Sequence, residues 1–91
     1  ESVLQQNFPN PFNGSTTIRF QLAAADFVRL DLYNPAGQRV RRLIDEARKP
    51  GYHQVVWDGK DEQGRAVSTG LYLAYLQVGE VVQVKKMLLT K

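Results

Sequence analysis

The chain contains no cysteine, and only one histidine and one methionine occur among its 91 residues. Disulfide bonds, thiolate metal sites and cysteine nucleophiles are therefore excluded. His53 has no cysteine or second histidine with which to bind zinc, and no serine or threonine stands in a nucleophile-elbow context. The chain is also too short to offer much room for a cleft between paired carboxylates. These absences predict a domain without catalytic activity.

Long hydrophobic runs are missing as well, because none approaches the roughly 20 residues that a membrane helix needs. No transmembrane segment is therefore expected. The formal net charge is only +3, although basic residues gather at Arg39, Arg41, Arg42, Arg48 and Lys49. No aromatic side chains interleave with them to stack on bases, so the cluster favours the solvated face of a strand over a nucleic-acid site.

The apolar content of 43% and the charged content of 23% are typical of a single folded domain. We expect an N-terminal loop over residues 1–14, a β-domain over residues 15–91, and a monomer. The chain begins at Glu1 and its only methionine is Met87, so we expect it to be excised from a longer protein.

Hydrophobic residues alternate with polar ones along several short segments. Residues 16–22 place Ile18, Phe20 and Leu22 on one face, and residues 27–33 repeat the pattern. A period of two residues is typical of half-buried strands and is incompatible with a helix. We predict strands at 16–22, 27–33, 38–44, 52–57, 65–67, 71–78 and 81–90, with 45–51 as a loop.

About seven strands without a significant helix predict an all-β, immunoglobulin-like antiparallel sandwich. The run Leu71 to Leu76 is apolar on both faces, so we expect it in a central strand. Trp57 is predicted to anchor the core from a middle strand, with a hydrogen-bond partner for its indole N–H. Gly37 is expected at a positive-φ turn position, and Gly79-Glu80 at a two-residue hairpin.

The segment Asn7 to Asn13 predicts a rigid loop, because its two prolines, Pro9 and Pro11, fix φ and remove backbone donors. Asn10 suits a side-chain-bonded turn. Our hypothesis is that Phe8 or Phe12 covers one open end of the sandwich.

Acidic residues gather in one loop at Asp58, Asp61 and Glu62. Their spacing departs from the EF-hand pattern, so we expect them to satisfy turn backbone groups, with calcium as the alternative. No cofactor is expected.

Aromatic residues offer a second alternative, a platform that stacks on sugar rings as in a carbohydrate-binding module. Core and cross-strand packing is preferred, because most of the candidates fall within apolar alternation. Tyr33 and Tyr52 are the two expected to be exposed. The candidates are Tyr33, Tyr52, Trp57, Tyr72 and Tyr75.

Motifs along the whole chain together resemble the C-terminal (type A) sorting domains of the type IX secretion system. Those that carry the resemblance are Asn7-Phe8-Pro9-Asn10-Pro11-Phe12-Asn13, Thr16 to Phe20, Val28 to Tyr33, Gly37, Gly51-Tyr52-His53, Trp57-Asp58-Gly59, Asp61, Gly64, Val67, Gly70-Leu71-Tyr72 and Lys85-Lys86-Met87. Gly14 and Asn34 depart from the usual proline and aspartate. The middle, from Val28 to Tyr72, is also similar to the related Ig-like domain of flagellar hook-capping proteins.

The resemblance implies a non-catalytic secretion signal at the end of a large exported protein of Bacteroidetes-type bacteria, often a hydrolase. It implies passage through the periplasm, recognition by the outer-membrane type IX translocon, removal by a surface sortase, and a cell-surface or secreted destination for the attached N-terminal cargo. The segment expected to be recognised, by strand addition or by charge, contains Lys85, Lys86, Met87, Leu88, Leu89 and Lys91. A carbohydrate-binding module and a passive Ig-like spacer are the alternatives.

Overall fold

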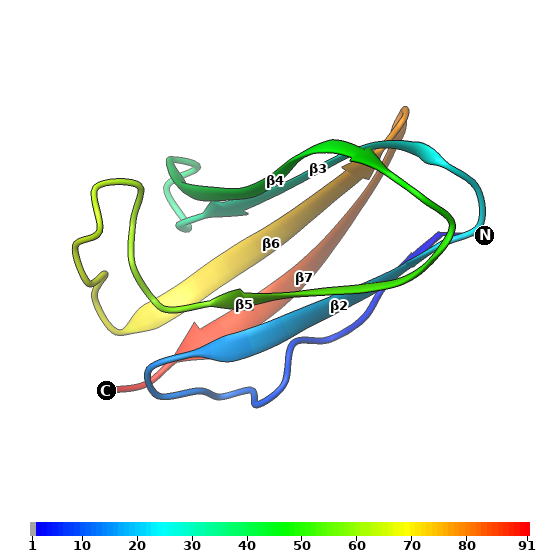
Figure 1. Ribbon diagram of the computed structural model, residues 1–91. Coiled ribbons are helices and arrows are strands. Elements are labelled where there is room, and N and C mark those ends of the chain that lie inside the picture. The colour runs from blue at the N-terminus through cyan, green and yellow to red at the C-terminus, as the bar shows by residue number, and fades with distance from the viewer. Residues whose placement is uncertain (1) are drawn as a thin grey trace.

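Two layers of antiparallel strands make up the computed structural model, which describes residues 2–91 (Figure 1). The three-stranded sheet has the order β1-β2-β5, with β1 at Val3–Leu4, β2 at Thr16–Leu22 and β5 at Gly51–Trp57. The four-stranded sheet has the order β4-β3-β6-β7, with β3 at Asp26–Tyr33, β4 at Arg39–Arg48, β6 at Gly70–Val78 and β7 at Val81–Leu89. The predicted all-β, immunoglobulin-like sandwich is confirmed. No helix that could cross a membrane occurs in residues 2–91.

The core lies between the two sheets and is filled by alternate residues of each strand. In β3 the side chains of Val28, Leu30 and Leu32 are fully buried. Facing them, β2 contributes Ile18 and Phe20, each 1% exposed. The two-residue period therefore predicted the inward faces correctly. The apolar strand β6 also takes its predicted central place, between β3 and β7.

Trp57 is fully buried and anchors the core, as predicted. Its indole N–H donates to the carbonyl oxygen of Lys60 at 2.9 Å, and its ring contacts those of Phe12 and Tyr72 at centroid distances of 5.7 and 5.3 Å. The prediction of a middle strand was wrong, because β5 is the edge of its sheet. The N-terminal segment supplies β1, a strand that the sequence did not predict, on the other side of β2.

Strand β4 continues through the polar stretch that we expected to form a loop. Asp45 lies opposite Arg29 of β3, and their side chains form an ion pair at 3.2 Å. Charged side chains suit an edge strand, where they face water and discourage further pairing. Composition alone therefore misassigned this segment.

The predicted strand at 65–67 is replaced by a turn with a single bridge between Lys60 and Ala66. Asp61 closes that turn, because its Oδ1 accepts the backbone N–H groups of Gln63 and Arg65 at 3.0 and 2.9 Å. The hairpin at Gly79-Glu80 is confirmed, with Val78 paired directly to Val81. Gly37 has the predicted positive φ, at 85°.

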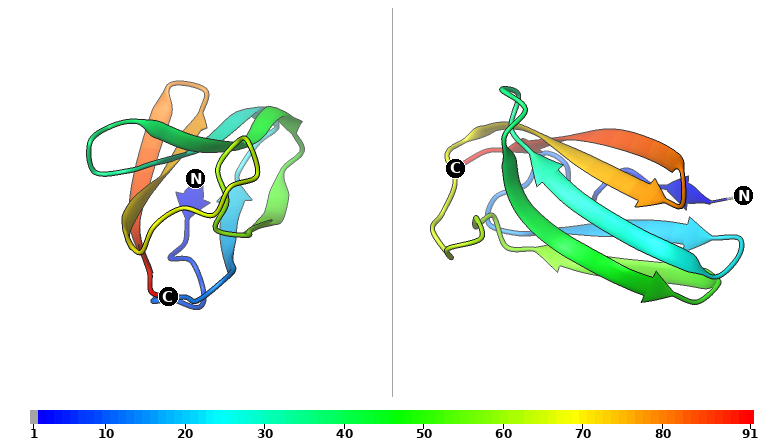
Figure 2. Two further views of the ribbon diagram at one scale, coloured as in Figure 1. Left: turned by 90° about the vertical axis from the view of Figure 1, so that its left-hand side faces the viewer. Right: turned by 90° about the horizontal axis from the view of Figure 1, so that it is seen from above.

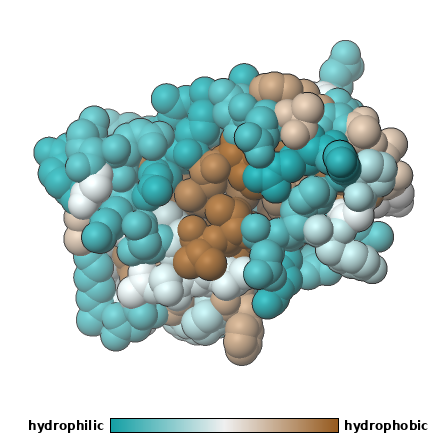
Figure 3. Space-filling model, in the orientation of Figure 1, coloured by the Kyte–Doolittle hydropathy of each residue, from teal (hydrophilic) through white to brown (hydrophobic). Residues whose placement is uncertain are grey.

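The two long edges of the sandwich differ. Along one edge, the loop between β1 and β2 fills the space between β2 and β7 (Figure 2). Along the other, apolar surface is visible in the opening between β4 and β5 (Figure 3). The half-buried side chains of Val40 on β4 and Val55 on β5 pack against the core. Within residues 2–91, only the first of these two edges is closed by a further segment of the chain.

Candidate recognition surface at the terminal strand

The last strand, β7, alternates between core and solvent over its final residues. Met87 and Leu89 are fully buried, whereas Leu88 between them is 40% exposed. Met87 lies opposite Tyr72 of β6, and Leu89 lies opposite Gly70. The strand is therefore both the edge of its sheet and a part of the core.

This alternation divides the six residues expected to be recognised. Lys86, Leu88 and Lys91 are exposed, and Lys85 is half-buried. Met87 and Leu89, which were also expected to meet a partner, expose no side-chain surface in the folded domain. We call the exposed side chains of Lys86, Leu88, Thr90 and Lys91 the terminal surface.

Strand addition at this end of β7 was one of the two expected modes of recognition, and in the structure the outer edge there is already occupied. The backbone N–H of Phe12 donates to the carbonyl oxygen of Leu88 at 2.9 Å, and the N–H of Thr90 donates to that of Phe12 at 2.8 Å. The side-chain oxygen of Asn10 accepts the N–H of Leu88 at 2.9 Å. The N-terminal segment already occupies the edge, so only side chains remain for recognition here.

A buried polar cluster below this edge escaped the sequence analysis. Asn7 is 3% exposed, and its Nδ2 donates to Thr16 Oγ1 at 3.0 Å and to the carbonyl oxygen of Pro9 at 3.2 Å. Thr16 Oγ1 donates to the same carbonyl at 2.8 Å. Gln6 extends the cluster to β7 by donating to the carbonyl oxygen of Lys86. The sequence feature that could have indicated this cluster is Asn7, an asparagine two residues before a loop proline, because asparagine side chains commonly bond to turn backbone groups.

The two phenylalanines of the N-terminal segment have opposite environments. Phe12 is 2% exposed and covers the end of the sandwich beside Trp57, as one form of our hypothesis predicted. Phe8 is 70% exposed, so the other form is wrong. The backbone of Phe8 nevertheless pairs with Thr17 of β2 through two hydrogen bonds of 2.9 Å. Only Phe12 contributes its side chain to the core.

The motif Trp57-Asp58-Gly59, at the end of β5, packs closely against the N-terminal segment at Gly14. Gly59 has a φ of 75°, and a Cβ built on it would lie 2.9 Å from the carbonyl oxygen of Gly14. Any larger residue would be strained and would push the backbone of Gly14 away. Asp58 closes its own turn by accepting the N–H of Lys60 at 3.1 Å. These residues are therefore structural.

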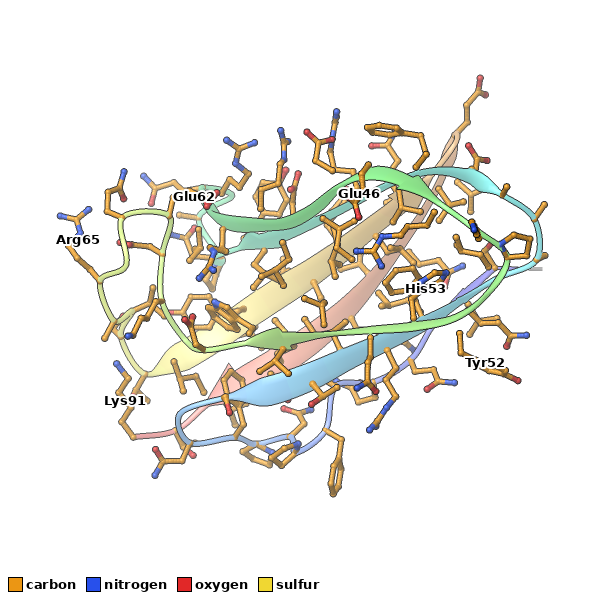
Figure 4. The ribbon with its side chains drawn as sticks, viewed as in Figure 1. Glu46, Tyr52, His53, Glu62, Arg65 and Lys91 are labelled. Atoms are coloured by element: carbon orange, nitrogen blue, oxygen red, sulfur yellow. The ribbon has the colours of Figure 1, made fainter. Side chains whose placement is uncertain are left out.

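The last residue is attached to the loop before β6. The backbone N–H of Lys91 donates to Thr69 Oγ1 at 3.2 Å, and its Nζ contacts the carbonyl oxygen of Val67. Lys91 lies at the same end of the sandwich as Glu62 and Arg65, away from Tyr52 and His53 (Figure 4). The terminal surface is thus held by the N-terminal segment and by the loop before β6.

Carboxylates near this end are engaged by arginines and by backbone groups. Arg41 contacts Asp58 at 3.1 Å and Glu62 at 3.7 Å. The pKa of Asp61 is lowered mainly by the backbone N–H of Arg65, which donates to it. Within residues 2–91 no three His, Asp or Glu side chains are grouped to hold a metal ion. The loop is therefore organised by protein donors.

A further arginine of the basic cluster is neutralised on β4. Arg42 forms two hydrogen bonds with the carboxylate of Asp31, at 2.8 and 3.0 Å, and this contact raises the pKa of the arginine. Arg48 contacts Glu46 at 2.8 Å. The positive charge of this cluster is therefore largely paired within the fold.

The aromatic residues do not gather into a flat surface. Trp57 and Tyr72 are buried, and the rings of Tyr33 and Tyr75 meet edge-on, at 69° and 5.4 Å. Tyr52 is 79% exposed, as expected. Tyr33 was also expected to be exposed, but it is half-buried. Tyr75 is the more exposed ring of the Tyr33–Tyr75 pair.

Comparisons with known proteins agree on the fold. The family model of the FlgD Ig-like domain matches residues 6–80. Among solved structures, latent PorU from Porphyromonas gingivalis superposes with a TM-score of 0.77 at 21% identity, over 98% of this chain and 9% of PorU. FlgD from Xanthomonas campestris gives 0.66 at 22% identity, over 96% of this chain and 64% of that protein. No curated protein matches the sequence.

A third structure is PorZ, an essential surface component of the type-IX secretion system of P. gingivalis. It superposes with a TM-score of 0.67 at 13% identity, over 97% of this chain and 11% of PorZ. The chain therefore spans only about a tenth of PorU and of PorZ.

Proposed function

The chain belongs to the FlgD Ig-like domain family, and from that premise we propose that it is a non-catalytic sorting module of the type IX secretion system. In this role it directs an attached cargo protein from the periplasm through the outer-membrane translocon to the cell surface, where a sortase acts on it. The sequence motifs resemble the sorting domains of that system, and its component PorZ has a similar fold.

The observation that carries the proposal is the terminal surface. The family match ends at residue 80, so β7 lies beyond it. In β7 the buried side chains of Met87 and Leu89 fix the backbone, and this holds Lys86 and Leu88 on the outside at fixed spacing. A partner therefore meets the cations of Lys86 and Lys91 and the apolar side chain of Leu88, without having to order a flexible tail first.

A reporter export assay tests this proposal. A reporter with a Sec signal, fused ahead of the domain, is expressed in a bacterium that has a type IX system. Lys86→Glu together with Lys91→Glu should leave the reporter in the periplasm, because the reversed charges repel a partner that recognises cations. Substitution is preferable to deleting residues 85–91, because that deletion would also remove two core side chains.

The matched control is Lys49→Glu with Lys60→Glu, which makes the same charge change at exposed positions outside the terminal surface. It should be exported like the wild-type fusion, and both variants should melt within a few degrees of it. Full export of the terminal variant would instead indicate a passive spacer. Tight binding of a soluble polysaccharide that depends on Tyr52 would favour a carbohydrate-binding module.

A further inference from the structure

The first half of β7 has an unpaired edge. Leu88 and Thr90 point their backbone groups away from β6, toward the N-terminal segment. Strand alternation places the backbone groups of Val82 and Val84 on the same outer side. Within residues 2–91 nothing bonds to them there, since neighbouring β1 is held through the side chain of Gln83 instead. Two donors and two acceptors are therefore free along this edge.

The side chains on this half are apolar and exposed. Val81 is 59% exposed, Val82 44% and Val84 43%. On the outer face of the sheet, Val84 lies beside Tyr75, which is itself 41% exposed. β-branched residues on an unpaired edge are suited to pairing with another strand.

The charges around this edge indicate which strand fits. Glu80 precedes the valines and Lys86 follows them, each three residues from Gln83. We propose that β7 pairs antiparallel with β7 of a second copy, about a two-fold axis through Gln83. Val82 then lies opposite Val84 of the second copy in a hydrogen-bonded pair, and this register brings the turn residue Glu80, which precedes β7, next to Lys86 of the second copy.

The two-fold axis repeats each of these pairs. All the free groups of Val82 and Val84 become bonded, and two four-stranded sheets join into one. Moving the axis to Lys85 would oppose two lysines and would bring the second copy against the N-terminal segment at Leu88. The proposed dimer is an alternative to the monomer expected from the sequence. It does not depend on the proposed function.

A charge-exchange series with sedimentation equilibrium tests the dimer. Glu80→Lys and Lys86→Glu should each raise the dissociation constant of the dimer about tenfold, because each places like charges opposite one another twice. The double variant restores opposite charges, and its constant should return to within about threefold of the wild-type value. Lys60→Glu, an exposed lysine away from the edge, should leave the constant unchanged.

A cysteine probe tests the register, since the chain has no cysteine of its own. Gln83→Cys places two thiols opposite each other at a non-hydrogen-bonded pair, where the Cα atoms lie about 4.5 Å apart, and mild oxidation should give a covalent dimer. Gln77→Cys, on β6, should stay monomeric under the same conditions.

Two results would overturn the dimer: wild-type protein that stays monomeric at concentrations of about 1 mM, or a double variant that does not regain the affinity lost by the single ones. Glu80→Lys should weaken the dimer without altering any residue of the terminal surface. Export of a reporter fused to this variant therefore tests the sorting function separately from the dimer.

Discussion

The two halves of β7 differ in what covers their outer edge, although both belong to one strand of one sheet. From Lys86 to Thr90 the N-terminal segment closes the edge with backbone and side-chain hydrogen bonds. From Val82 to Val84 the outer backbone groups have no hydrogen-bond partner within residues 2–91, and β1 is held there only through the side chain of Gln83. Local sequence alone does not explain this difference, because both halves expose apolar side chains, Val82 and Val84 in one and Leu88 in the other. What differs is the loop that returns to one half only.

The two halves of β7 separate the contacts that stabilise the fold from those available for association with a second copy. At the closed half, Phe12, Trp57 and Tyr72 form an aromatic cluster beneath the strand. Closing this edge therefore also seals the core. At the open half the exposed valines leave apolar surface and backbone groups available to a partner. Substitutions of the buried side chains that seal the closed half should act mainly on folding, and substitutions of the exposed valines at the open half mainly on association.

The largest expected effect is that of Phe12→Ala. It removes a buried ring from the closed end, and we expect it to lower the free energy of unfolding by about 3–5 kcal/mol. Phe8→Ala is the matched control, because its ring is 70% exposed. It should change the free energy by about 0.5 kcal/mol or less. Urea unfolding of both variants measures the difference.

Equal destabilisation by the two substitutions would contradict the assignment of Phe12 as the ring that seals the end. If Phe12→Ala lowers the free energy of unfolding but leaves the dissociation constant of the dimer unchanged, the result would support the division of β7 into a folding half and an association half.

A smaller effect is expected for Asn10→Ala, which removes the acceptor of the Leu88 N–H. The free energy of unfolding should fall by about 0.5–1.5 kcal/mol, and the Leu88 amide should exchange with solvent faster. Asn13→Ala is the control, since that side chain is exposed on the same loop. In the wild-type monomer the Val84 amide should already exchange fast. Strong protection of Val84 at low concentration would show that the edge is not open.

Several features of the fold could be predicted because they depend on neighbours in the sequence. The alternation in β2 and β3, the hairpin at Gly79-Glu80 and the burial of Trp57 all follow from local pattern and side-chain size. The extension of β4 could not, because Asp45 is held in the strand by Arg29, a partner 16 residues away.

The terminal surface was predicted only in part for the same reason. The sequence marked the terminal residues, and alternation could have indicated that Met87 and Leu89 share one face. That this face meets the core, and that Phe12 covers the adjoining edge, depends on contacts between opposite ends of the chain. No local pattern encodes a pairing across more than 70 residues.

The smallest expected effect concerns acid. Hydrogen bonds from the N–H groups of Arg65 and Gln63 lower the pKa of Asp61 below its ordinary value of 3.8. A carboxylate with a lowered pKa stabilises the folded state fully above 3.8, and this contribution is lost as pH falls through the folded-state pKa. Asp61→Asn should therefore make stability less sensitive to pH below about 4, as acid titrations of the melting temperature would measure. The turn of Asp61 holds Glu62 and Arg65 at the same end of the sandwich as Lys91 (Figure 4), whereas Val84 lies in the open half of β7. Acid should therefore release the Arg65 amide first and leave exchange at Val84 unchanged. If Asp61→Asn kept the full acid sensitivity of the wild type, another carboxylate would be responsible for that sensitivity.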